Sequence, residues 1–222
     1  LAHFKGHEMT GFGGSIKNLG MGGGSRAGKM EQHSSGKVVV DAEKCRGCRR
    51  CAPECGSSAI HYENNKAVID PEVCKGCGRC IGACPFDALS NDQWDANDVL
   101  DRKMAEYTQA ICQDRPTFHI NMAMDISPNC DCHGDNDAPI LPNLGIFTSF
   151  DPVACDQAAV DACQKATPLS NSQLGDHLAQ ADWQHHHDVF LDSNPHVNWE
   201  ETLIHAEKIG LGTRRYELVT IK

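Results

Sequence analysis

Apolar residues recur at helical spacing in three parts of the chain, residues 91–112, 151–166 and 199–209. Residues three and four positions apart share one face of a helix, so each part predicts an amphipathic helix. Asp151 can cap the second helix, and Pro152 suits its first turn, where a missing N–H does no harm. These signals define the helical part of the expected fold.

Alternation of apolar and polar residues predicts strands elsewhere in the chain. Residues 116–126 and 140–149 each predict a strand, residues 127–139 form a polar loop between them, and residues 216–221 predict a closing strand. Strand, loop, strand and helix in this order indicate an α/β layer, with α+β as the alternative class. In the first strand one face collects the side chains of Phe118, Ile120, Met122 and Met124.

Residues 37–91 follow a different pattern, because they repeat themselves after 29 positions. Each half predicts a short strand, a cysteine loop, a helical turn and a second short strand. We therefore expect a glycine-rich segment at 1–36 that belongs to the α/β part, an inserted domain at 37–91, and the rest of the α/β domain at 92–222. The two ends of the insert are expected to lie close together.

Composition narrows the classes of function. The formal net charge is −10, whereas nucleic-acid binding favours a basic face, so we expect no nucleic-acid partner. No stretch approaches about 18 consecutive apolar residues, and no signal peptide is evident, so we expect no membrane span. Eight of the 13 cysteines fall in two regular runs rather than in a secreted disulfide pattern, which indicates a reducing interior and a cytoplasmic protein.

The two cysteine runs both have the spacing C-x2-C-x2-C-x3-C, and the second run ends in Cys84-Pro85. This stretch resembles the bacterial two-cluster ferredoxin domain, in which the fourth cysteine of each run ligates the other cluster. The resemblance implies two [4Fe–4S] clusters. The first would be held by Cys45, Cys48, Cys51 and Cys84, and the second by Cys74, Cys77, Cys80 and Cys55. A pair of zinc sites is the alternative, although zinc sites favour paired C-x2-C knuckles with longer gaps.

The segment HFKGHEMTGFGGSIKNLGMG, followed by SRAGK, carries a second resemblance. Together with Ser127-Pro128-Asn129-Cys130-Asp131-Cys132 and Asp151-Pro152-Val153-Ala154, it resembles the iron–sulfur proteins of domain of unknown function 362. Members of that family carry a ferredoxin insert after the first segment. Because they usually have a further N-terminal α/β portion, the resemblance implies either that this chain is a fragment or that a partner subunit supplies that half.

The glycine-rich segment contains the candidate catalytic residues His3, His7 and Lys17, together with Lys29. Glycine lets the backbone approach a ligand closely, and the cations could hold a small anion. By composition, a flexible terminus with solvated charges is an equally weighted alternative. A short similarity of this segment to the nickel-pincer lactate racemase family implies a role for these histidines and lysines in holding a cofactor.

Cys130, Cys132 and His133 place three metal-binding side chains in the polar loop after a predicted strand. We expect this loop to contribute to a further metal or redox-active site, with His3 or His7 as completing ligands. The alternative is a reduced thiol pair that only packs in the turn. A second histidine group is interpreted as an exposed helix face rather than a metal site. It comprises His177, His185, His186, His187 and His196.

Three functions remain open from the sequence. The first is an iron–sulfur electron-transfer protein, or a redox subunit of anaerobic metabolism that works with redox protein partners. The second is an oxidoreductase whose α/β half binds a small anionic substrate or metal cofactor through the glycine-rich histidine and lysine segment. The third is a non-redox scaffold in which the clusters only stabilise the fold.

Overall fold

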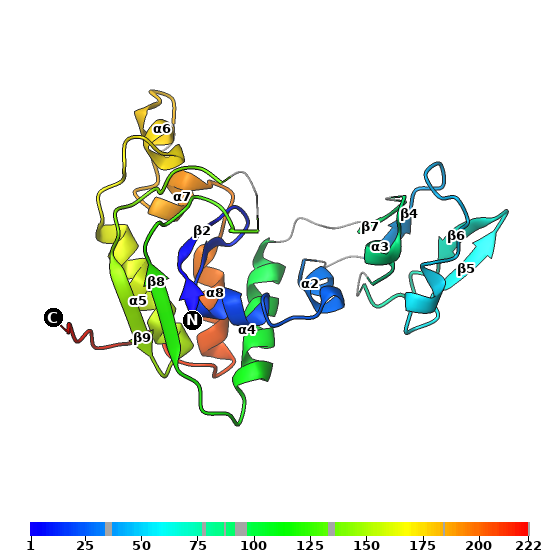
Figure 1. Ribbon diagram of the computed structural model, residues 1–222, viewed down its shortest axis with the longest axis horizontal. Helices are drawn as coiled ribbons and strands as arrows, with labels where there is room; N and C mark the ends of the chain where they lie inside the picture. The colour runs from blue at the N-terminus through cyan, green and yellow to red at the C-terminus, as the bar shows by residue number, and fades with distance from the viewer. Residues whose placement is uncertain are drawn as a thin grey trace. The chain divides into compact units, whose positions relative to one another are not determined.

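The computed structural model describes residues 1–33, 37–76, 79–86, 88–91, 97–132, 136–183 and 185–221. The chain divides into two compact units, one formed by Leu1–Gly23 with Asp101–Lys222 and the other by Gly24–Leu100. Figure 1 shows both, with labels on several of their helices and strands. We call them the first unit and the second unit and describe each by itself.

The first unit is built on a three-stranded sheet with the order β1-β8-β9. Strand β1 (Ala2–His3) runs parallel to β8 (His119–Ala123), and β9 (Gly145–Ser149) pairs antiparallel with β8. Both longer strands fall inside the predicted stretches, but each is only five residues long. A two-stranded ribbon of β2 (Lys5–His7) and β3 (Gly11–Gly13) continues the chain from β1. The sequence therefore identified the sheet and overestimated the length of its strands.

Helix α5 (Pro152–Lys165) packs against β8 and β9, and α1 (Ser15–Gly20) packs against α5. The predicted capping of α5 is confirmed, because the Asp151 carboxylate accepts the N–H groups of Val153 at 2.8 Å and Ala154 at 3.0 Å. The remaining helices are α4 (Asn97–Cys112), α6 (Gln173–Ala179), α7 (Val189–Ser193) and α8 (Trp199–Lys208). The first five residues after Asn91 of the predicted helix 91–112 lie outside the described residues.

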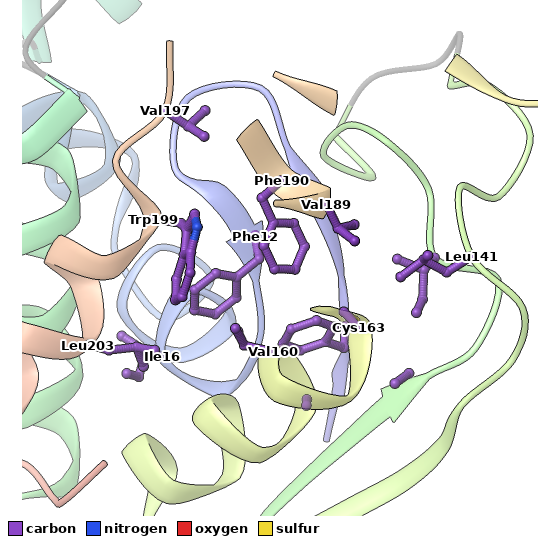
Figure 2. Packing of buried hydrophobic residues seen from close by; sticks show 14 of the residues in the cluster. Phe12, Ile16, Leu141, Val160, Cys163, Val189, Phe190, Val197, Trp199 and Leu203 are labelled. Carbon is purple, nitrogen blue, oxygen red and sulfur yellow. The ribbon is translucent and has the colours of Figure 1, made fainter. Parts of the chain in front are cut away.

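Aromatic side chains fill the core of the first unit (Figure 2). Phe12 lies at their centre, with its ring centroid 5.4 Å from Phe4, 5.7 Å from Phe190 and 6.3 Å from Trp199. Phe4 and Phe12 are buried together with Ile16. This burial shows that the start of the glycine-rich segment is part of the folded core. The alternative of a flexible terminus is therefore wrong for residues 1–23.

In its described residues, the second unit contains four short strands arranged as two antiparallel pairs. Strand β4 (Val38–Val40) pairs with β7 (Leu89–Asn91), and β5 (Ile60–Glu63) forms a hairpin with β6 (Lys66–Ile69). The turn of this hairpin is made by Asn64 and Asn65, whose φ values are 47° and 59°. Asparagine tolerates this left-handed region better than most residues. Each half of the repeat thus contributes one strand to each pair, β4 and β5 from the first half and β6 and β7 from the second.

Short helical turns separate the strands of the second unit. They are the 3₁₀ helix η1 (Ala52–Glu54) and helix α3 (Arg79–Ala83), and α2 (Arg26–Gln32) contacts α3. The order of strand, loop, helical turn and strand in each half is the one that the repeat predicts. The structure assigns Gly24 and the α2 residues to the second unit, so the boundary between the units lies after Gly23 rather than near residue 36.

Two predictions in the last third of the chain are wrong. Residues 216–221 form no strand, and Leu218, Val219 and Ile221 are exposed by 62%, 74% and 92%, because no neighbouring strand pairs with this segment. His185, His186 and His187 precede α7 in a loop instead of lying on a helix face. His187 has a φ of 57°, a conformation that an α-helix does not contain.

Candidate functional site

Two cavities in the second unit are lined by cysteine thiols. Cys45, Cys48 and Cys51 of the first run line one cavity together with Cys84, the last cysteine of the second run. Cys45 and Cys51 are buried, whereas Cys48 is exposed. The structure therefore brings together the four cysteines that the sequence assigned to one cluster, although they come from both halves of the repeat.

The second cavity is lined by Cys74 and Cys80 of the second run together with Cys55 of the first. Cys77, the fourth member of the predicted set, lies outside the described residues. In both cavities the last cysteine of one run joins the first cysteines of the other. Crossing of this kind follows from the strand pairing, since β4 of the first half pairs with β7 of the second.

Main-chain and side-chain donors point at these sulfur atoms. The N–H of Ala59 lies 3.2 Å from Cys55 Sγ, and the N–H of Ala88 lies 3.4 Å from Cys84 Sγ. These two contacts occupy equivalent positions in the two halves of the repeat. In Cys55 burial alone would raise the thiol pKa, but hydrogen bonds led by Ala59 hold the pKa below its usual value. Such donors stabilise a thiolate, which is the form that binds metals.

Two lysines repeat the same pattern at the entrance to each cysteine loop. Lys66 Nζ donates to the carbonyl oxygen of Cys45 at 2.5 Å, and Lys37 Nζ donates to that of Cys74 at 2.7 Å. The hydroxyl of Tyr62 lies 3.3 Å from Cys51 Sγ. Each loop is thus fixed at its first cysteine, and the Cys51 sulfur has a polar partner.

A polar site in the first unit is formed by side chains from the glycine-rich segment and from the loop after β8. We call it the Lys17–Cys130 site. It contains His3, Lys5, Lys17, Cys130 and Asp131. Lys17 Nζ lies 2.8 Å from Cys130 Sγ, His3 Nδ1 lies 2.9 Å from Asp131 Oδ2, and Lys5 Nζ lies 3.5 Å from the same carboxylate oxygen. The predicted proximity of the Cys130 loop to the glycine-rich segment is therefore present.

Local geometry explains why these side chains meet. The backbone of β2 passes so close to the Cys130 loop that a Cβ on Gly6 would collide with the backbone oxygens of Ser127 and Pro128. The Gly6 N–H also donates to the Ser127 carbonyl at 2.8 Å. Glycine at this position lets the ribbon and the loop pack against each other, which brings Lys5 and Asp131 together.

Burial and charge set the ionisation of the site. Burial lowers the pKa of Lys5, and Lys17 lowers it further, while Asp131 and Cys130 oppose the change. Burial on its own would raise the pKa of Asp131, but the hydrogen bond from His3 and the charge of Lys5 hold it below its usual range. The two lysines are thus balanced by a carboxylate and by the Cys130 sulfur.

The other predicted participants are placed differently. His7 is buried, and its Nδ1 accepts the N–H groups of Met9 at 3.1 Å and Thr10 at 3.3 Å, so this ring stabilises the turn between β2 and β3. His133 lies outside the described residues, and Lys29 belongs to the second unit. Among the described residues, no three or more histidine, cysteine, aspartate or glutamate side chains are grouped so that they could hold a single metal ion.

Sequence reasoning missed a buried polar network beside the sheet. Asp156 on α5 accepts hydrogen bonds from the N–H groups of Ser15 at 2.6 Å and Ile16 at 3.0 Å and from Asn121 Nδ2 at 2.7 Å. Burial raises the pKa of Asp156 to about 6, although these hydrogen bonds oppose the rise. A polar residue on the packed face of a helix was the available signal, since Asp156 lies among apolar neighbours on α5.

Residues 1–161 match the protein family described as "Domain of unknown function (DUF362)". A comparison with curated proteins found no match. Within the part of the chain that the structure describes, no helix is long and apolar enough to cross a membrane.

Proposed function

The chain belongs to the DUF362 family, and we propose that its second unit binds two [4Fe–4S] clusters and that the protein transfers electrons. It would act as an electron-transfer protein or as the iron–sulfur subunit of a larger redox complex, with other redox proteins as donor and acceptor. Because so many free thiols survive only in a reducing compartment, we place this function in the cytoplasm.

The grouping of the thiols is the observation that carries the proposal. Four sulfur atoms at 2.3 Å from one zinc ion would lie within about 4 Å of one another. In the described residues no such single-ion geometry is present, yet Cys45, Cys48, Cys51 and Cys84 line a common cavity. Four cysteines of both halves that line one cavity, without the close grouping that a single ion needs, favour a polynuclear cluster over a zinc ion.

The residues around each cavity would tune the cluster rather than react. A bound [4Fe–4S] cluster supplies one-electron transfer, and ligation by cysteine alone favours a low potential. The N–H groups of Ala59 and Ala88 and the hydroxyl of Tyr62 would donate to the ligand sulfurs. Donors of this kind stabilise the more negative, reduced cluster and so raise its potential.

Anaerobic purification followed by iron and acid-labile sulfide analysis tests the proposal. We expect about eight of each per chain, and a reversible low-potential reduction seen by protein-film voltammetry and electron paramagnetic resonance. Cys84→Ser should lower the iron content, whereas Cys112→Ser, which lines neither cavity, should leave it unchanged. Stoichiometric zinc in place of iron would refute the proposal, and clusters that cannot be reduced would support the scaffold function instead.

A second candidate function is favoured by the Lys17–Cys130 site. A buried lysine beside a second lysine offers ammonium donors that a small anionic substrate could bind in exchange for their present partners, as expected for a redox enzyme. Inorganic phosphate and a panel of small carboxylates are suitable probes. An anion that protects residues 1–23 from proteolysis in the unmutated protein, but not in Lys5→Met, would support this function. Equal protection of both proteins would refute it.

A further inference from the structure

Cys130 of the Lys17–Cys130 site and the nearby Cys132 lie in contrasting surroundings. Cys130 is only 2% exposed, whereas Cys132, two positions later, is exposed. The Cys132 N–H lies 3.4 Å from Cys130 Sγ, and the Cys132 thiol forms a side-chain hydrogen bond with the same sulfur. One sulfur is therefore buried and surrounded by donors, and its neighbour faces the solvent.

Lys17 is placed to stabilise a negative charge on Cys130, because its Nζ lies 2.8 Å from Cys130 Sγ. Burial alone would raise the pKa of Cys130, but the hydrogen bonds from Cys132 and Lys17 outweigh burial and lower it. Burial, together with the hydrogen bond to Cys130 and its charge, raises the pKa of Cys132 to about 11. Cys130 is thus the more acidic of the two thiols, so a negative charge on the reduced pair is favoured at Cys130 over Cys132.

We propose that Cys130 and Cys132 form a redox-active pair whose disulfide oxidises low-molecular-weight thiols, with Lys17 stabilising the Cys130 thiolate that is released. The pair lies wholly in the first unit, so this inference does not rest on the iron–sulfur function. Residues two positions apart in a turn can reach the Cα separation of roughly 4.4–6.8 Å that a disulfide requires.

The positions of the two sulfurs fix the order of the steps. An incoming thiolate attacks the exposed Cys132 sulfur, the Cys130–Cys132 bond breaks, and Cys130 leaves as the thiolate paired with Lys17. A second thiolate then attacks the substrate sulfur of the mixed disulfide, and Cys132 leaves and takes up a proton. In total, two substrate thiolates and one proton react with the protein disulfide. The products are one substrate disulfide, the Cys130 thiolate and the Cys132 thiol.

The same geometry makes the disulfide an oxidant rather than a structural bond. A thiol of lower pKa is the better leaving group, and a couple whose reduced form is stabilised has a higher reduction potential. Cys155 and Cys163 provide the contrast, because burial raises the pKa of each to about 12. They therefore serve as unreactive internal references.

The test uses the full-length protein, purified anaerobically and equilibrated with mixtures of reduced and oxidised glutathione. After acid quenching and alkylation, mass spectrometry reads the state of Cys130 and Cys132 separately from the other cysteines. We expect a reversible disulfide at this pair while Cys155 and Cys163 stay reduced. Replacing Lys17 by methionine should shift the equilibrium toward the disulfide at least tenfold, which corresponds to a potential about 30 mV lower.

Matched variants separate the charge of Lys17 from its packing. Lys17→Arg keeps the cation, so its thiol–disulfide equilibrium should stay close to that of the unmutated protein. This variant can also be measured if Lys17→Met does not fold, and a large shift in it would then contradict the role of the cation. Lys208→Met, which removes an exposed lysine from α8, should change nothing.

Three results would overturn the inference. The first is that no disulfide forms at the most oxidising ratio, and the second is an unchanged equilibrium in Lys17→Met. The third is a metal ion that is present in the unmutated protein and lost in the Cys130→Ser, Cys132→Ser double variant. The double variant keeps all eight cysteines of the repeat, so its iron content is expected to stay unchanged. An unchanged iron content therefore agrees with the inference, whereas a loss of iron would contradict it.

Discussion

Replacing Asp156 by asparagine tests how the buried carboxylate couples the stability of the first unit to pH. The group has a pKa of about 6 in the folded protein, compared with the ordinary value of 3.8. Below pH 3.8 the carboxyl group is protonated in both the folded and the unfolded chain, so its full contribution to stability is present. Between the two values the folded chain holds a proton that the unfolded chain has lost, and stability therefore falls as the pH rises.

The size of this effect follows from the two pKa values. A difference of one pKa unit corresponds to about 1.36 kcal/mol, so Asp156 should remove about 3 kcal/mol from the free energy of unfolding over the whole titration, and about 2 kcal/mol of this between pH 4 and pH 7. Asparagine does not titrate, so this contribution disappears in Asp156→Asn. Its amide also turns a donor toward the Ile16 N–H, which lowers the stability by about 1–3 kcal/mol at every pH.

Hydrogen exchange of peptides that contain Ser15 and Ile16, corrected for intrinsic rates, reports the first unit whatever the state of the second. We expect the difference in free energy of unfolding between Asp156→Asn and the unmutated protein to shift by about 2 kcal/mol, in favour of the variant, from pH 4 to pH 7. Asp182→Asn, which replaces an exposed carboxylate, should retain the pH dependence of the unmutated protein. Parallel curves for Asp156→Asn and the unmutated protein would show that this carboxyl group does not titrate in that range and would refute the reasoning.

Three further predictions concern packing and the sulfur donors. Phe12→Ala should lower the free energy of unfolding of the first unit by about 3–5 kcal/mol in chemical denaturation, whereas Phe150→Ala, at a side chain that is 79% exposed, should change it little. Tyr62→Phe removes a hydrogen bond to Cys51 and should lower the potential of the proposed cluster in voltammetry, and an unchanged potential would show that this donor has no effect. Gly6→Ala should destabilise the first unit by about 1–3 kcal/mol in the same denaturation assay, because its Cβ would collide with the loop after β8, and unchanged stability would contradict that crowding.

The helices were predictable because their signals are local. Asp151, Pro152 and the apolar spacing of α5 lie within one stretch of chain, and no distant residue was needed to interpret them. The succession of elements in each half of the repeat was predicted for a similar reason, since a repeat with equivalent halves predicts equivalent elements. The prediction of a strand at residues 216–221 was wrong because alternation indicates only that a segment could form a strand. Whether it does depends on a partner strand, which their own sequence does not specify.

The sheet of the first unit shows a subtler limit of pattern reasoning. Alternation in β8 predicted an apolar face with Ile120 and Met122, and these residues do share a face. In the structure, however, the opposite face is the more buried one, and it carries His119 and Asn121. Asn121 is buried because it donates to Asp156 and its side-chain oxygen accepts from the Ser15 hydroxyl at 2.8 Å. A polar residue whose hydrogen bonds are satisfied can occupy a core position that a hydrophobic scale would deny it.

The two candidate sites differ in the same way. One could be predicted from a short stretch of sequence, whereas the other depends on contacts between distant residues. Membership of the thiol sets was implied by the resemblance of the two cysteine runs to the two-cluster ferredoxin domain, which local spacing alone made recognisable. Contact between Lys17 and Cys130 was not available, since 113 positions separate them and only the packing of the ribbon on the loop brings them together. The sequence indicated that the Cys130 loop would face the first segment, but it pointed to histidines as the partners. The lysine pairing changes the chemistry that the site supports, because an ammonium group stabilises a thiolate, whereas a neutral imidazole would have completed a metal site.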